Sequence, residues 1–195
     1  DKYDWKLLEQ LMERFPEHGL SKLARGYQLS KEGDIDQAFD LFSEGLDACP
    51  DSLFGYQCLS WIYYESKEYE TGLEYATRGK DLVKKIKLET GISKSNVLLS
   101  LEICMAHCYR LLDKKYHMDA MALYKSILQH YPDQTEALEG MGLILIEEKR
   151  LDEALVSFEK VQQLDPKNHT SVAELGWIYC EKKEYQRAID YINKA

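Results

Sequence analysis

Residues 135–168, TEALEGMGLILIEEKRLDEALVSFEKVQQLDPKN, decide how this chain folds. Apolar residues recur at helical spacing in two blocks, which are separated by the charged stretch Glu147–Arg150. The small residues Gly142 and Ala154 stand where two antiparallel helices must approach closely. Pro166 closes the stretch, because proline cannot continue a helix interior. The segment therefore predicts one helix–turn–helix unit of 34 residues.

The same spacing is found along the rest of the chain. Pro16 and Pro50 are 34 residues apart, and so are Pro132 and Pro166. A period of 34 is typical of tetratricopeptide repeats, in which helix pairs stack into an array. We therefore predict an all-α fold, a right-handed α-solenoid of tetratricopeptide helix pairs. The predicted parts are a second helix of a preceding repeat at 1–18, and repeats at 19–52, 53–100, 101–134, 135–168 and, truncated, 169–195.

The repeat at 53–100 departs from the period. Its 48 residues exceed the period by 14, and Lys84 stands where the other complete repeats have their proline. We expect a long helix from about Glu68 to Leu88, a stop at Gly91 and an early start of the next helix near Ser95. The extra residues are either a neutral elongation or a projecting edge that marks one family.

Short polar residues next to the turns predict helix caps. Asp34 follows the turn glycine of the first repeat and is a predicted N-cap. Asp51 or Ser52, and Asp165, are the predicted caps near repeat boundaries.

Composition and charge exclude several classes of protein. The chain has 195 residues, of which 45% are hydrophobic, and 34 acids against 25 bases give a net charge of −9. Nucleic-acid binders cluster Lys and Arg, whereas the basic stretch Lys80–Lys87 is interpreted as a solvated helix face, so direct RNA binding is only a minor alternative. No apolar run is long enough to predict a membrane span. Five cysteines, without a signal pattern, favour reduced thiols and a cytoplasmic or nuclear location, and the non-Met start predicts a piece of a longer chain.

No pattern in the sequence predicts catalysis. Cys104, His107 and Cys108 lie close together in one predicted helix, but a metal site needs ligands that converge from several elements, and both cysteines fall at core positions of the repeat. The other cysteines and histidines show no ligand spacing and no nucleophile–base pattern, and there is no glycine-rich phosphate loop. We expect no enzyme activity, no cofactor and no metal.

The first helices of the pairs are expected to line a concave, partner-binding face. Their ninth and twelfth positions form an apolar and aromatic ladder with carboxylates beside it, which suits an extended or helical peptide of apolar and basic character. The alternative is that some of these side chains pack between neighbouring first helices. The candidate partner-binding residues are Tyr27, Trp61, Tyr64, Tyr109, Leu143, Ile146, Trp177, Glu139 and Glu147.

A narrower resemblance depends on the order of several stretches. These are Gln57–Tyr64 (QCLSWIYY), Lys67–Glu70 (KEYE), Ala120–Tyr124 (AMALY), Gly140–Ile144 (GMGLI) and Ala173–Trp177 (AELGW). With the lengthened repeat between them, the chain resembles the tetratricopeptide scaffold subunits of superkiller complexes. The resemblance implies a non-catalytic scaffold in a cytoplasmic assembly with a DExH-box RNA helicase and WD-repeat subunits, which feeds RNA to the exosome for 3′-to-5′ decay. The alternative is an adaptor of another assembly, such as a ubiquitin-ligase or trafficking complex.

Overall fold

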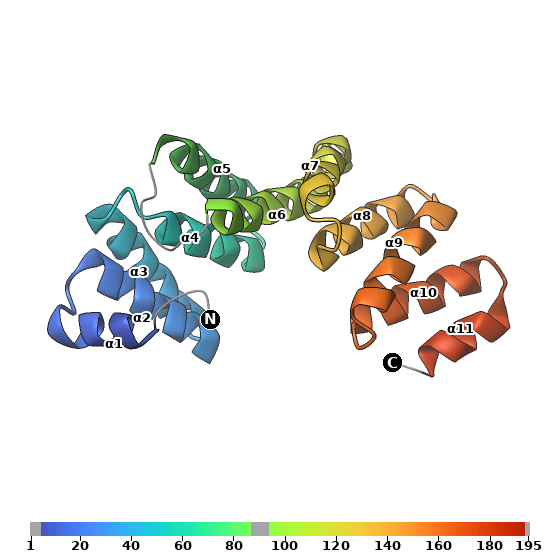
Figure 1. The fold of residues 1–195 in the computed structure, drawn as a ribbon, viewed down its shortest axis with the longest axis horizontal. Coiled ribbons are helices and arrows are strands. Elements are labelled where there is room, and N and C mark those ends of the chain that lie inside the picture. Colours follow the sequence, from blue (N-terminus) through green and yellow to red (C-terminus); the bar gives the residue numbers. More distant parts are fainter. Residues whose placement is uncertain (1–4, 87–93, 194–195) are drawn as a thin grey trace. The chain divides into compact units, whose positions relative to one another are not determined.

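The computed structural model describes residues 5–86 and 94–193, and the regular elements of this part of the chain are helices, without a strand (Figure 1). The helices are α1 (Trp5–Arg14), α2 (Gly19–Glu32), α3 (Ile35–Ala48), α4 (Leu53–Glu65), α5 (Tyr69–Lys85), α6 (Lys94–Leu112), the 3-10 turn η1 (Lys114–Tyr116), α7 (His117–His130), α8 (Thr135–Glu147), α9 (Leu151–Leu164), α10 (His169–Glu181) and α11 (Tyr185–Ile192). The chain divides into two units, Asp1–Cys108 and Tyr109–Ala195. The predicted all-α fold of tetratricopeptide helix pairs is confirmed.

The first unit is built from the pairs α2–α3 and α4–α5, which pack together through α3 and α4. Its core contains Leu23, Phe42 and Leu59, each almost fully buried. Gly26 of α2 lies so close to α3 that an added Cβ would stand 2.9 Å from the Phe42 ring. Glycine therefore permits the helix approach, and the aromatic ring fills the space beside it.

The second unit repeats this arrangement with the pairs α8–α9 and α10–α11, and α7 packs on α8. Ala154, Phe158, Leu175 and Tyr179 belong to its buried core. Gly142 of α8 faces Phe158 of α9, where an added Cβ would lie 2.7 Å from the ring. This is the same close contact that Gly26 makes with its aromatic partner in the first unit.

Four of the helix pairs turn in the same way, through one residue with left-handed backbone. Gly33 has this conformation with a φ of 91°, and Lys67, Lys149 and Lys183 have it with φ values of 64°, 60° and 61°. In each turn the next residue donates its N–H to a carbonyl five residues earlier, as Arg150 does to Leu145 at 2.8 Å. These bonds satisfy carbonyls that the helix end leaves open.

The helix caps agree with the sequence in three places. Asp34 caps α3 and accepts a hydrogen bond from the N–H of Gln37 at 3.3 Å, and Ser52 caps α4 through the N–H of Gly55 at 3.2 Å. Asp165 is the C-cap of α9, and its N–H donates to the Val161 carbonyl at 2.8 Å, whereas Asn168 caps the start of α10 and accepts from the Ser171 N–H at 2.7 Å.

The second helix of the lengthened repeat, α5, is shorter than predicted. The backbone of Ile86 is already extended, with φ −81° and ψ 130°, so α5 ends at Lys85 and not at Leu88. A β-branched side chain favours that conformation over the helix. The predicted stop at Gly91 lies outside the described residues, whereas the early start near Ser95 is confirmed, because α6 begins at Lys94.

Candidate protein-interaction surface

Trp61 of α4 is the centre of an aromatic cluster in the first unit. Its Nε1–H donates a hydrogen bond to Ser100 Oγ of α6 at 3.0 Å. Its ring meets the Tyr64 ring edge to face, with centroids 5.4 Å apart and an interplanar angle of 86°. A second edge contact reaches His107 at 6.0 Å. These contacts join α4 to α6, so Trp61 holds two first helices together, although its side chain is only half-buried.

Tyr64 extends this cluster towards the following helix. Its ring stacks on the His107 imidazole at 5.6 Å and lies 6.0 Å from the ring of Tyr69, the first residue of α5. His107 stands at a repeat position that usually carries leucine, so the sequence signalled a departure there without showing that the imidazole joins the aromatic rings. The cluster of Trp61, Tyr64, Tyr69 and His107 remains partly exposed and is therefore an aromatic surface as well as a packing contact.

Tyr27 is placed one repeat earlier in the same unit. Its ring lies 5.9 Å from the Phe54 ring of α4, and the Lys31 ammonium stands 5.3 Å above it. All three predicted residues of this unit, Tyr27, Trp61 and Tyr64, thus make contacts between neighbouring first helices, as the packing alternative expected. We call Tyr27, Trp61 and Tyr64 the first-helix surface of the first unit, and Tyr109, Leu143, Ile146 and Trp177 the first-helix surface of the second unit.

In the second unit the exposed member of the first-helix surface is Trp177 of α10, with 43% of its surface accessible. Leu143 and Ile146 of α8 are half-buried and pack against the core of that unit. Tyr109 contacts the Tyr116 ring at 5.7 Å, and burial raises the pKa of its phenol. Trp177 therefore offers the second unit's largest accessible aromatic group on a first helix.

The predicted carboxylates are less free than the sequence suggested. Glu139 accepts a hydrogen bond of 2.5 Å from the Asn168 amide, and burial raises its pKa. Glu147 stands 3.7 Å from the imidazole of the buried His117. In the first unit, Glu102 pairs with Lys80 at 2.8 Å. The carboxylates beside the ladder thus partly serve to fix neighbouring helices.

Cysteines and other metal-ligating groups are dispersed. Cys58, Cys104 and Cys108 are buried, and the Cys104 thiol donates to the Ser60 carbonyl at 3.3 Å, which agrees with the predicted packing role. Interaction with Cys108, together with burial, raises the pKa of Cys104. In residues 5–86 and 94–193, no three His, Cys, Asp or Glu side chains gather as metal ligands, and no helix is both long and apolar enough to cross a bilayer.

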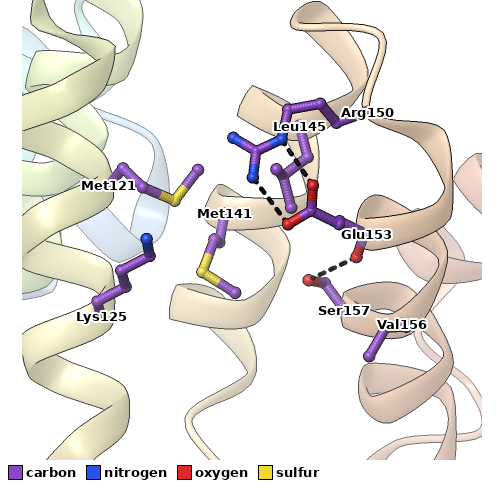
Figure 2. Close-up of a pocket in the computed structure, with 8 residues that line it drawn as sticks. All are labelled: Met121, Lys125, Met141, Leu145, Arg150, Glu153, Val156 and Ser157. Atoms are coloured by element: carbon purple, nitrogen blue, oxygen red, sulfur yellow. Dashed lines mark hydrogen bonds and ion pairs between the residues drawn. The ribbon is translucent and has the colours of Figure 1, made fainter.

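One feature of the second unit was not predicted from the sequence. A cavity of about 260 Å³ opens between α7, α8 and α9, lined by Met121, Lys125, Met141, Leu145, Arg150, Glu153, Val156 and Ser157 (Figure 2). Arg150 forms two hydrogen bonds with Glu153, both of 2.7 Å, at one side of it. Met121 and Lys125 approach from the opposite helix. Leu145 and Ser157 are the residues in the sequence that could have indicated the cavity, but only the structure shows that both of them line it.

Comparison with known proteins gives similarities of three kinds. Family models described as tetratricopeptide repeat match residues 111–169 and 145–195. Superkiller protein 3 of Schizosaccharomyces pombe is 26% identical over 160 residues, which are 82% of this chain and 11% of that protein. The anaphase-promoting complex subunit CDC16 of Saccharomyces cerevisiae is 22% identical over 161 residues, 83% of this chain and 18% of that protein. This chain therefore spans less than a fifth of the length of these relatives.

Among solved structures, the chain is similar to a crystal structure of the APC/C hetero-tetramer Cut9–Hcn1. The TM-score is 0.78 at 17% identity, and the match covers 97% of this chain and 35% of that one. At this identity the likeness concerns the fold. The helix pairs, the 34-residue spacing and the repeat models that match residues 111–195 together show the fold, which is an α-solenoid of tetratricopeptide helix pairs.

Proposed function

We propose that this chain is a non-catalytic scaffold that binds segments of partner proteins on its first-helix surface. The observation that carries the proposal is the partly exposed aromatic cluster around Trp61 and Tyr64, together with exposed Trp177. Aromatic side chains dominate binding energy at protein interfaces, because they bury much apolar area at a small entropic cost. A net charge of −9 favours partner segments with apolar and basic residues over RNA.

The more specific proposal is a scaffold of the superkiller type. In that case the partners are a DExH-box RNA helicase and WD-repeat subunits, and the assembly acts in the cytoplasm in 3′-to-5′ mRNA decay by the exosome. The similarity to superkiller protein 3 over 82% of the chain supports this assignment, together with the order of repeat motifs around the lengthened repeat.

A second candidate is a subunit that resembles those of the anaphase-promoting complex. One observation favours it, the 22% identity to CDC16 over 83% of the chain. Both candidates use the same physical device, a row of helix pairs that presents aromatic side chains to a partner. They differ in the identity of the partner, which therefore decides between them.

The test is an affinity capture from cytoplasmic extract, with the full chain immobilised and the captured proteins identified by mass spectrometry. Trp177→Ala and the double variant Trp61→Ala with Tyr64→Ala probe the two parts of the first-helix surface. Tyr185→Ala, which changes an exposed aromatic residue on a second helix, is the matched control. Circular dichroism verifies that each variant is folded, since Trp61 also packs α4 on α6.

Each result has one meaning. An RNA helicase with WD-repeat proteins, lost in the first-helix variants and kept in Tyr185→Ala, supports the superkiller type. Subunits of an anaphase-promoting complex with the same pattern support the second candidate. Capture that is equal in all folded variants contradicts the role of the first-helix surface. Capture that disappears after nuclease treatment and falls steeply with salt indicates RNA binding instead.

A further inference from the structure

Two repeats fill the space between their paired helices with stacked tyrosines. Tyr63 of α4 stacks on Tyr75 of α5, with ring centroids 5.3 Å apart and an interplanar angle of 16°. Tyr179 of α10 stacks on Tyr191 of α11 in nearly the same way, at 5.5 Å and 14°. The residues of each pair are the eleventh and twenty-third of their predicted repeats. These two positions thus form a site that accepts aromatic rings side by side.

The repeat of α8 and α9 has no rings at these positions. Leu145 and Ser157, which lie 34 residues before Tyr179 and Tyr191, replace the stacked pair. Both residues line the cavity of about 260 Å³ between α7, α8 and α9 (Figure 2). The cavity therefore lies where two other repeats of the same chain place aromatic side chains.

The walls of the cavity suit an aromatic occupant. Met121 of α7 and Met141 of α8 line it, and thioethers adapt to a ring and make favourable sulfur–aromatic contacts. Val156 of α9 is 66% exposed and lies among the lining residues. Pockets for small molecules usually measure about 300–1,000 Å³, so a smaller cavity fits one side chain of a partner better.

The charges around the cavity determine which type of residue fits next to the partner's aromatic side chain. The guanidinium of Arg150 is neutralised by hydrogen bonds to Glu153 and, at 2.9 Å, to Glu148. Lys125, on the opposite wall, stands outside the hydrogen bonds of Arg150, and its charge helps to lower the pKa of Glu153. The lining residues thus carry two positive charges, on Lys125 and Arg150, against one negative charge on Glu153, and this excess attracts a carboxylate.

We propose that the cavity between α7, α8 and α9 binds a segment of a partner protein that inserts one aromatic side chain and places an adjacent acidic residue against Lys125. The ring takes the space that Tyr179 and Tyr191 fill in their own repeat, between Met121 and Met141. This site is formed largely by second helices, so it is separate from the first-helix surface and has its own ligand chemistry, acidic and aromatic where the other is basic and apolar.

The experiment uses the full chain with ¹³C-labelled methionine methyl groups, observed by NMR during titration with synthetic nine-residue peptides. The probes have Asp-Tyr, Asp-Ala or Lys-Tyr at their centre in an otherwise constant Gly-Ser sequence. With the Asp-Tyr peptide, the methyl signals of Met121 and Met141 shift, while Met12 and Met105, which do not line the cavity, stay in place. The Asp-Tyr peptide binds about ten times more tightly than the Asp-Ala peptide, since it alone fills the cavity.

Two variants make the test specific. Ser157→Tyr restores an aromatic ring at the position of Tyr191, and it abolishes the shifts because the cavity is then filled from within. Lys125→Glu, at an exposed position that does not endanger folding, weakens binding of the Asp-Tyr peptide and strengthens binding of the Lys-Tyr peptide. Lys167→Glu changes the net charge equally at an exposed position outside the cavity and leaves the preference unchanged.

Several results would overturn the proposal. These are equal affinity for the Asp-Tyr and Asp-Ala peptides, an absence of shifts at Met121 and Met141, or equal effects of Lys125→Glu and Lys167→Glu. A shift of the same two methyl signals on concentrating the chain without peptide would assign the cavity to a second copy of the chain instead.

Discussion

The indole N–H of Trp61 is bonded to the Ser100 hydroxyl at 3.0 Å, and this contact joins α4 to α6 across 39 residues of sequence. Ser100→Ala leaves the partly buried N–H without its acceptor. We expect the free energy of unfolding to fall by about 1 kcal/mol, the usual effect of losing such a bond. Urea denaturation followed by tryptophan fluorescence measures the change. Ser95→Ala, on the exposed first turn of α6, is the control and changes little; equal effects of both substitutions would show that the bond is unimportant for stability.

Three lysines occupy backbone conformations that glycine adopts more readily. Lys67, Lys149 and Lys183 have positive φ values at the turn where the first repeat has Gly33. The left-handed conformation strains a residue with a Cβ. Glycine is not strained there, and its only cost is the larger conformational entropy that it loses on folding. Each Lys→Gly substitution is expected to stabilise the protein by about 0.5–1 kcal/mol.

The reciprocal variant tests the cause of this effect. An added Cβ at Gly33 meets no atom within 4 Å, so Gly33→Lys loses stability through its backbone alone. Thermal unfolding by circular dichroism compares the four variants. A loss of stability in the Lys→Gly series would mean that the lysine side chains contribute more than the backbone costs.

Gly140 of α8 is predicted to tolerate no side chain. A Cβ added there would overlap the ring and hydroxyl of Tyr124, which is fully buried on α7. Gly140→Ala is therefore expected to destabilise the protein by about 1–3 kcal/mol, despite the higher helix propensity of alanine. Chemical denaturation at constant pH measures the change.

Gly176 of α10 supplies the matched control. An added Cβ there would lie 3.1 Å from Ile192, whose side chain is 57% exposed and can move aside. Gly176→Ala should leave stability unchanged or raise it, by up to about 1 kcal/mol. Similar losses at both glycines would contradict the role assigned to Tyr124.

The raised pKa of Glu139 predicts a pH dependence of stability. Burial raises the pKa, while the hydrogen bond from the Asn168 amide opposes the shift, and Glu136 and Asp165 add to it. The folded state then holds the proton more tightly than the unfolded state. The free energy of unfolding therefore decreases as the pH rises from the ordinary glutamate pKa through the raised one.

Glu139→Gln removes the partly buried charge and keeps an acceptor for Asn168. We expect the variant to be more stable than the parent chain at neutral pH, and the difference to shrink below the ordinary glutamate pKa, where the parent carboxyl is neutral in both states. Urea titrations at pH 7 and pH 4 measure this. Glu181→Gln, at an exposed position of α10, is the control; a benefit of Glu139→Gln that is equal at both pH values would contradict the electrostatic cause.

The local physics of the repeat made the helices and their pairing predictable. Glycine at 26 and 142, alanine at 154 and the spaced prolines act within a few residues of their own positions, and so do the caps Asp34 and Ser52. The end of α5 was missed because neither glycine nor proline marks it, and the chain departs from the helix at Ile86. The left-handed lysines were missed because only the recurrence of the turn, not the residue type, indicates them.

By itself, the sequence determined that the chain forms tetratricopeptide helix pairs, because a period of 34 and the placement of small residues depend on contacts between helices that are close in sequence. The tertiary structure alone decided which of the aromatic residues are surface and which are packing. Trp61 bonds to Ser100 and Tyr64 stacks on His107, whereas Trp177 stays exposed. The physical reason is that such contacts, like the cavity beside Leu145 and Ser157, depend on which side chains of separate helices meet, and the period of a repeat does not specify them.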